Sequence, residues 1–136
     1  MKMKMLMLFA FSLLTLATTG FAENIVLVNQ TSYPIKNQKS KIAIQWAVSA
    51  REVDEGNKAL IYGLELKPET LQIVKESGKV ELTIPEKVEY FRVIVWSKDE
   101  KDPDLVTNWV DIVPNKTYTL ETDHLVPSVL MSGTGC

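Results

Sequence analysis

The segment Val88–Ser97 places large side chains on both faces of an extended chain. Successive residues of a strand point to opposite sides, and one side of this segment is uniformly apolar, because it holds Phe91, Val93 and Val95. We assign that side to the protein core. The alternate residues are then expected to face outward, and they are Tyr90, Arg92, Ile94 and Trp96.

The segment Asn108–Val113 shows the same alternation, with Val110 and Ile112 as its apolar pair. If the two segments are neighbouring strands, one outer sheet face combines Tyr90, Arg92, Trp96, Trp109 and Asp111. Trp, Tyr and Arg often dominate the binding energy of protein interfaces, and flat indole rings also suit stacking against a sugar. We therefore predict a binding face for a protein or a glycan, with a cross-strand ion pair between Arg92 and Asp111. The alternative is a central strand whose second face is covered by a loop or by the C-terminal segment.

Catalytic and metal chemistry have little support in the residue types. One histidine, His124, and one cysteine, Cys136, exclude a Cys/His zinc site and most nucleophile–base triads. Residues 52–57 and 98–104 offer carboxylates to a hard cation. Neither run has the spacing of an EF-hand loop, and Lys98 and Lys101 make the second one typical of a solvated loop. We expect no enzymatic activity, no cofactor and no bound metal.

Composition limits the partners and the size of the fold. The chain has 136 residues, of which 46% are apolar and 24% are charged, so it is long enough for one globular domain. The 15 basic and 17 acidic residues leave no basic surface able to hold a nucleic-acid backbone.

The first 22 residues have the pattern of a cleaved signal peptide. Lys2 and Lys4 form a positive start, and the apolar run Met5–Leu16 follows them. This run is shorter than the roughly 20 residues that a membrane-spanning helix needs, so no stable membrane anchor is expected. The small residues Gly20 and Ala22 predict cleavage after Ala22. We therefore expect an exported, periplasmic or extracellular domain over residues 23–136.

Hydrophobic alternation with a period of two dominates the rest of the chain. It predicts eight strands, at Ile25–Val28, Lys41–Ala50, Ala59–Leu66, Pro68–Gly78, Val80–Ile84, Val88–Ser97, Asn108–Val113 and Thr117–Thr122. Residues 51–58 are expected to form a hairpin loop, since they hold charges and a Gly-Asn pair. The Pro68–Gly78 stretch also fits a two-turn helix, although we favour a strand. About eight short strands indicate an all-β fold, an antiparallel β-sandwich of immunoglobulin-like architecture, with a small closed β-barrel as the alternative.

The C-terminal segment, from about residue 125 to 136, is expected to be a flexible tail that ends in an exposed Cys136. An unpaired cysteine in an exported protein is able to form an intermolecular disulfide and a covalent homodimer. The leading hypothesis is an exported, non-catalytic binding module for a protein or glycan. The alternative is a structural or assembly subunit that associates through its terminal segments and Cys136, and an enzyme of unrecognised type comes third.

Overall fold

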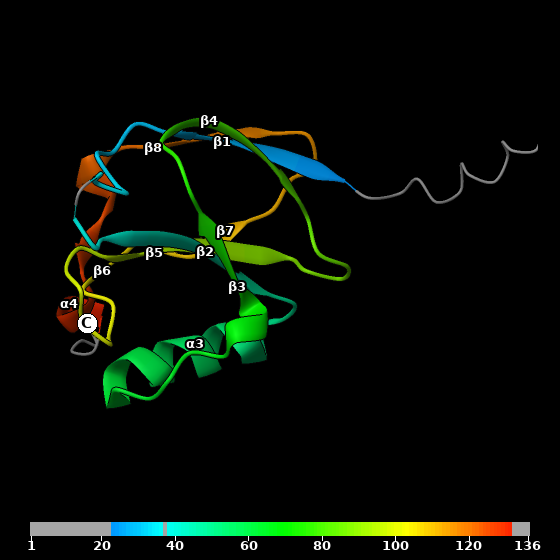
Figure 1. Cartoon of the computed structure of the whole chain (residues 1–136). Coiled ribbons are helices and arrows are strands. Elements are labelled where there is room, and N and C mark those ends of the chain that lie inside the picture. The colour runs from blue at the N-terminus through cyan, green and yellow to red at the C-terminus, as the bar shows by residue number, and fades with distance from the viewer. Residues whose placement is uncertain (1–22, 37, 132–136) are drawn as a thin grey trace, which may run out of the picture.

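The computed structural model describes residues 23–36 and 38–131. The chain folds into two stacked sheets with a helix against the outer face of one of them (Figure 1). The strands are β1 (Asn24–Asn29), β2 (Lys41–Ala47), β3 (Leu71–Val74), β4 (Gly78–Thr83), β5 (Tyr90–Trp96), β6 (Leu105–Val106), β7 (Val110–Asp111), β8 (Thr117–Leu120) and β9 (Val126–Pro127). This is the predicted β-sandwich, with nine strands in the described residues where the sequence indicates about eight.

The first sheet has the strand order β4-β1-β8, and the second has the order β3-β2-β5-β6-β9, with β7 also paired to β5. Most neighbours are antiparallel, whereas β1 and β8 run parallel. The two sheets remain separate layers, so the fold is the open sandwich and not the closed alternative.

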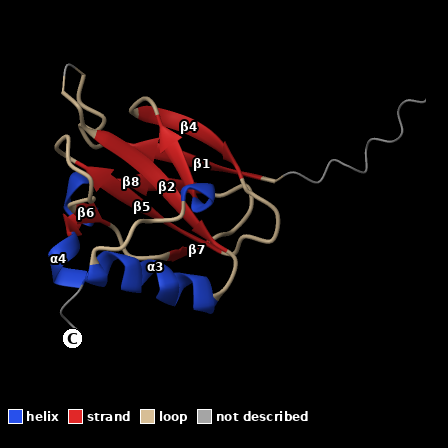
Figure 2. Ribbon diagram, turned by 60° about the horizontal axis from the view of Figure 1, so that its bottom comes forward, coloured by secondary structure: helices blue, strands red, loops and turns tan. Residues whose placement is uncertain are grey.

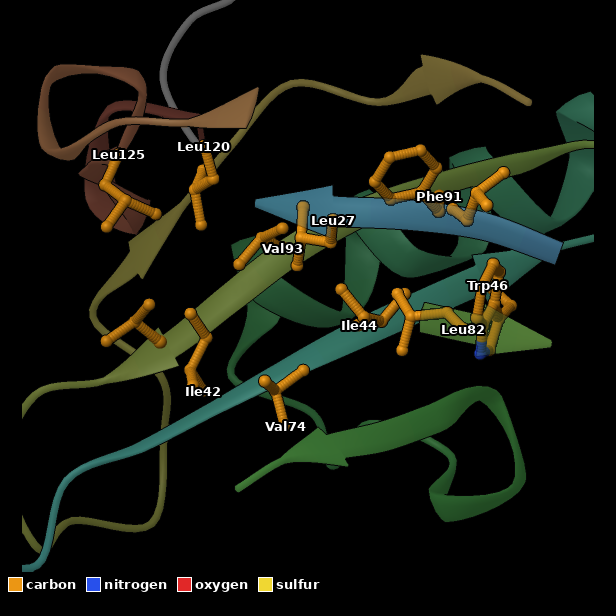
Figure 3. Close-up of a cluster of buried hydrophobic side chains, with 12 residues drawn as sticks. Leu27, Ile42, Ile44, Trp46, Val74, Leu82, Phe91, Val93, Leu120 and Leu125 are labelled. Atoms are coloured by element: carbon orange, nitrogen blue, oxygen red, sulfur yellow. The ribbon is translucent and has the colours of Figure 1, made fainter. Parts of the chain in front are cut away.

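The main core lies between the two sheets. Phe91 and Val93 of β5 point toward Leu27 of β1 and join one buried apolar cluster (Figure 3). The predicted alternation of β5 is therefore confirmed. The opposite side of β5 is also buried, and there Ile94 and Trp96 form a second cluster with Ala43, Leu66 and Val106.

Helix α3 (Ala50–Tyr62) covers this second side. The sequence-based prediction of a hairpin loop at 51–58 and a strand at Ala59–Leu66 is wrong. The Ser49 hydroxyl accepts a hydrogen bond from the Glu52 amide at 3.3 Å, and the Glu52 carboxylate accepts one from the Val48 amide at 3.0 Å. These two bonds satisfy backbone donors at the start of the helix, much as in a capping box. Gly63 ends the helix in the left-handed conformation, with φ at 64°.

The C-terminal part of the described chain is regular, so the predicted flexible tail is wrong over residues 125–131. Leu125 is buried, β9 pairs with β6, and α4 (Ser128–Met131) follows beside α3 (Figure 2). The preferred strand in the Pro68–Gly78 stretch is confirmed for Leu71–Val74, which form β3 after a 3-10 turn at Pro68–Thr70, whereas Gly78 already begins β4. The predicted signal peptide and Cys136 lie outside the described residues. Within those residues, no helix combines the length and apolar character required to cross a membrane.

Candidate functional site

A buried arginine fastens helix α3 to the second sheet. Arg92 is 0% exposed, and its Nε donates to Gln45 Oε1 of β2 at 2.7 Å. Its other two nitrogens reach the helix, since Nη1 donates to Asn57 Oδ1 at 2.9 Å and Nη2 donates to the Gly56 carbonyl at 3.0 Å. The rigid fork of the guanidinium group suits this arrangement, because three acceptors lie in three fixed directions.

The three acceptors of Arg92 are all neutral. Among the described residues, no carboxylate forms an ion pair with it, so the expected pair with Asp111 is absent. Burial lowers the pKa of Arg92 to about 10, because desolvation disfavours the charged form. The group therefore remains a cation at neutral pH, held by hydrogen bonds to neutral acceptors.

Trp109 completes this network from the neighbouring strand. The β5–β7 register pairs Tyr90 with Asp111 and Phe91 with Val110, which places Trp109 opposite Arg92. The guanidinium carbon lies 4.4 Å from the centroid of the indole ring, and the indole Nε1 donates to Asn57 Oδ1 at 3.1 Å. Such a stacked and desolvated cation is stabilised by the ring quadrupole.

Gly56 is the contact point of α3 with this pair. A Cβ atom at Gly56 would lie 3.1 Å from Trp109 Cζ2 and 3.2 Å from Arg92 Nη2. The absence of a side chain therefore lets the helix approach the sheet. Sequence reasoning missed Gln45, Gly56 and Asn57, because it interpreted Gly-Asn as a turn. The Ser49-x-x-Glu52 spacing is the signal that identifies the helix.

The predicted binding face is only partly assembled as expected. Its two strands are neighbours, and Arg92 and Trp109 meet, but the expected exposure is wrong for Arg92 and for Trp96, which is 6% exposed. The alternative prediction, a central strand with both faces covered, is correct for β5. The cover is helix α3, however, and not the predicted loop or C-terminal segment. The Trp96 indole lies apart from Trp109 and donates to the Lys101 carbonyl at 3.2 Å, with Lys41 Nζ 4.9 Å from the ring centroid.

Tyr90 and Asp111 are the more accessible members of the predicted face. Tyr90 is half-buried and Asp111 is exposed, and the two residues are paired across β5 and β7. They lie beside a cavity of about 390 Å³ near the end of the sandwich. The residues of the predicted face therefore lie in three places: Tyr90 and Asp111 at this cavity, Arg92 and Trp109 in the buried network under α3, and Trp96 apart from both.

A cleft opens between α3, β2 and the segment that connects α3 to β3. Its volume is about 410 Å³, which lies within the range of small-ligand pockets. The apolar part of its lining comes from both walls and includes Trp46, Ala59, Leu64 and Leu66. Gln45 and Gly56 also line it, and both are hydrogen-bond partners of Arg92. The buried arginine therefore fixes the two walls of the cleft relative to each other.

The rim of the cleft has an excess of negative charge. Four carboxylates and two ammonium groups surround it, namely Glu52, Glu55, Glu65, Glu69, Lys58 and Lys67. Both lysines already have acidic partners, since Lys58 lies 3.2 Å from Asp54 and Lys67 lies 3.9 Å from Glu55. Glu65 and Glu69 form no ion pair with any described residue.

The other acidic groups have structural contacts. Asp104 accepts hydrogen bonds from the Ser97 amide, at 2.8 Å, and from the Ser97 hydroxyl. Asp99 lies 3.5 Å from Lys39. Glu121, Asp123 and His124 form an exposed cluster, in which His124 Nδ1 accepts from the Glu121 amide at 3.0 Å.

No model of a known protein family matches the chain. A comparison with curated proteins likewise finds no relative.

Proposed function

We propose that this protein is an exported, non-catalytic binding module, and that its α3 cleft captures a partner-protein segment carrying apolar and basic side chains. The observation that carries the proposal is the combination of a mostly apolar cleft with the unpaired carboxylates Glu65 and Glu69 at its rim. Export rests on the signal-peptide pattern of residues 1–22.

The accessible chemistry favours a peptide over a glycan. Trp96 is buried, and Arg92 occupies one face of the Trp109 ring, so the two indoles do not form an open stacking surface for a sugar. Leu64, by contrast, is 58% exposed at the cleft. The aliphatic stem of a lysine or arginine lies well on such a surface while its charged head reaches a carboxylate.

The two kinds of contact differ in their expected contributions. Exposed ion pairs contribute about 0.2–1 kcal/mol each, so Glu65 and Glu69 chiefly determine the preferred sign of charge. Most of the affinity must then come from burial of apolar surface against Leu64 and Ala59, at roughly 25 cal/mol per Å² before the entropic cost of association.

The charge preference is tested with two sets of labelled peptides in a fluorescence anisotropy titration. In one set lysine or arginine alternates with leucine or phenylalanine, and in the other set glutamate replaces the basic residue. We expect binding of the basic set only. The double variant Glu65→Gln/Glu69→Gln should weaken that binding by roughly 2- to 30-fold, the factor that corresponds to two exposed ion pairs.

The matched control is Glu81→Gln/Glu86→Gln, which removes two exposed carboxylates at β4 and the following loop. An equal loss in both double variants would indicate attraction to the overall negative charge and would reject the cleft. Leu64→Ser tests the apolar contact, with Val113→Ser as its control because Val113 is similarly exposed elsewhere on the surface. Tighter binding of the glutamate set would contradict the proposal outright.

A further inference from the structure

Strand β8 has an unpaired edge. It pairs with β1 on one side, and no other described strand lies on its second side. The Val26 amide donates to the Lys116 carbonyl at 3.0 Å, and the Gln30 amide donates to the Leu120 carbonyl at 2.8 Å. These bonds direct the backbone groups of the even-numbered residues toward β1. The N–H and C=O groups of Thr117 and Thr119 therefore point away from the sheet, and both residues are exposed.

An apolar slot opens on the same side of the sandwich. It lies between the two sheets, has a volume of about 460 Å³, and is lined in part by Leu27, Phe91, Val93, Val110, Tyr118 and Leu120. The Tyr118 ring stands edge-on to Phe91, with 5.0 Å between centroids. The Tyr118 hydroxyl donates to the Asp111 carbonyl and accepts from the Val113 amide, both at 2.8 Å. The partly exposed Val110 and Tyr118 thus lie at a slot beside an open strand edge, a combination that favours strand addition.

We propose that a second copy of this chain pairs with β8, antiparallel and around a two-fold axis near Tyr118. The free backbone groups belong to residues two positions apart, so the rotation places Thr117 opposite Thr119 of the second copy. Directly opposed residues of this kind exchange two hydrogen bonds in an antiparallel ladder. Two such pairs give four hydrogen bonds, which use every outward backbone group of Thr117 and Thr119 in both copies.

The charges at the two ends of β8 agree with this orientation. Lys116 precedes the strand, whereas Glu121 and Asp123 follow it, and all three are exposed. An antiparallel pairing brings Lys116 of each copy beside the acidic end of the other copy. A parallel pairing would bring like charges together, which is unfavourable.

This association is independent of the proposed cleft. The cleft lies on the outer face of the second sheet, whereas β8 is an edge of the first sheet. Either surface is therefore able to function, or to fail, without the other.

Sedimentation equilibrium of the purified protein over a wide concentration range tests the proposal, with reductant present so that Cys136 forms no disulfide. The wild type should be a reversible dimer. Thr119→Pro removes an outward N–H that takes no part in pairing with β1. By symmetry it eliminates two of the four hydrogen bonds and should weaken dimerisation roughly 30-fold.

The matched control is Glu81→Pro on the opposite edge of this sheet. The Ile84 amide donates to the Glu23 carbonyl, so even-numbered residues of β4 face β1 and the Glu81 amide faces outward. Glu81→Pro should leave the dimer intact. Circular dichroism checks the folding of both proline variants.

Charge reversal decides the question if Thr119→Pro does not fold. Lys116→Glu should weaken the dimer, and Lys116→Glu combined with Glu121→Lys should restore it. A wild-type monomer at every concentration would overturn the proposal. So would a dimer that is insensitive to both Thr119→Pro and Lys116→Glu, because it would form through another surface.

Discussion

Replacement of Arg92 by methionine tests the network that holds α3 in place. Methionine keeps an unbranched apolar stem but removes all three hydrogen bonds. Asn57 Oδ1 keeps its bond from Trp109, and the Gly56 carbonyl keeps the i+4 backbone bond of the helix interior. Gln45 Oε1 is the acceptor that loses its donor. A buried acceptor without a donor costs about 1–3 kcal/mol. One such acceptor predicts that Arg92→Met lowers the free energy of unfolding by about 1–3 kcal/mol, compared with the roughly 5–15 kcal/mol of a typical domain.

Urea unfolding followed by tryptophan fluorescence and far-UV circular dichroism measures this loss. Arg92→Lys should be almost as unstable, because one ammonium group does not reach three acceptors in different directions. Arg51→Met is the matched control, since Arg51 is an exposed residue of α3 paired with Glu55 at 3.4 Å, and it should change stability by less than about 0.5 kcal/mol. Stability of Arg92→Met within 1 kcal/mol of the wild type, roughly the cost of a single hydrogen bond, would refute the reasoning.

Three further outcomes are expected. Gly56→Ala should destabilise the protein by about 1–3 kcal/mol in urea unfolding, because the new methyl group meets Trp109 and Arg92 at close range. Since alanine by itself favours helices, equal or greater stability would contradict the close approach. Ser49→Ala removes the helix cap and should lower stability by about 1 kcal/mol, with no change expected for Ser32→Ala at an exposed position. The stability difference between wild type and Arg92→Met should stay flat between about pH 5 and pH 9 and increase only at higher pH. The reason is that the folded-state pKa of Arg92 is about 10 and lies below its unfolded value. A marked change near pH 7 would indicate a different titrating group.

The sequence predicted the sandwich because half-buried strands show a clear period of two. The orientation of Phe91 and Val93 toward the core followed from this pattern alone. The pattern did not reveal what lies over the other face of β5. Side chains on that face recur at every second residue whether they face water or a covering helix. That ambiguity accounts for the wrong expectation at Arg92 and Trp96.

The missed helix has a specific physical cause. Gly56 and Asn57 are typical turn residues, and they sit in the middle of α3 because Gly56 permits close packing and Asn57 binds both Arg92 and Trp109. Local propensity therefore opposed a structure that tertiary contacts stabilise. The sequence did not predict the cleft either, since one of its walls is the same helix.

Amide chemical-shift mapping with the basic, apolar peptide set tests the central claim most directly. The account predicts shifts concentrated at the cleft, at Gly56, Ala59, Leu64 and Glu65, that saturate with peptide concentration and are lost in Glu65→Gln/Glu69→Gln. Shifts confined to Tyr90 and its neighbours, or no shifts at any peptide concentration, would contradict it.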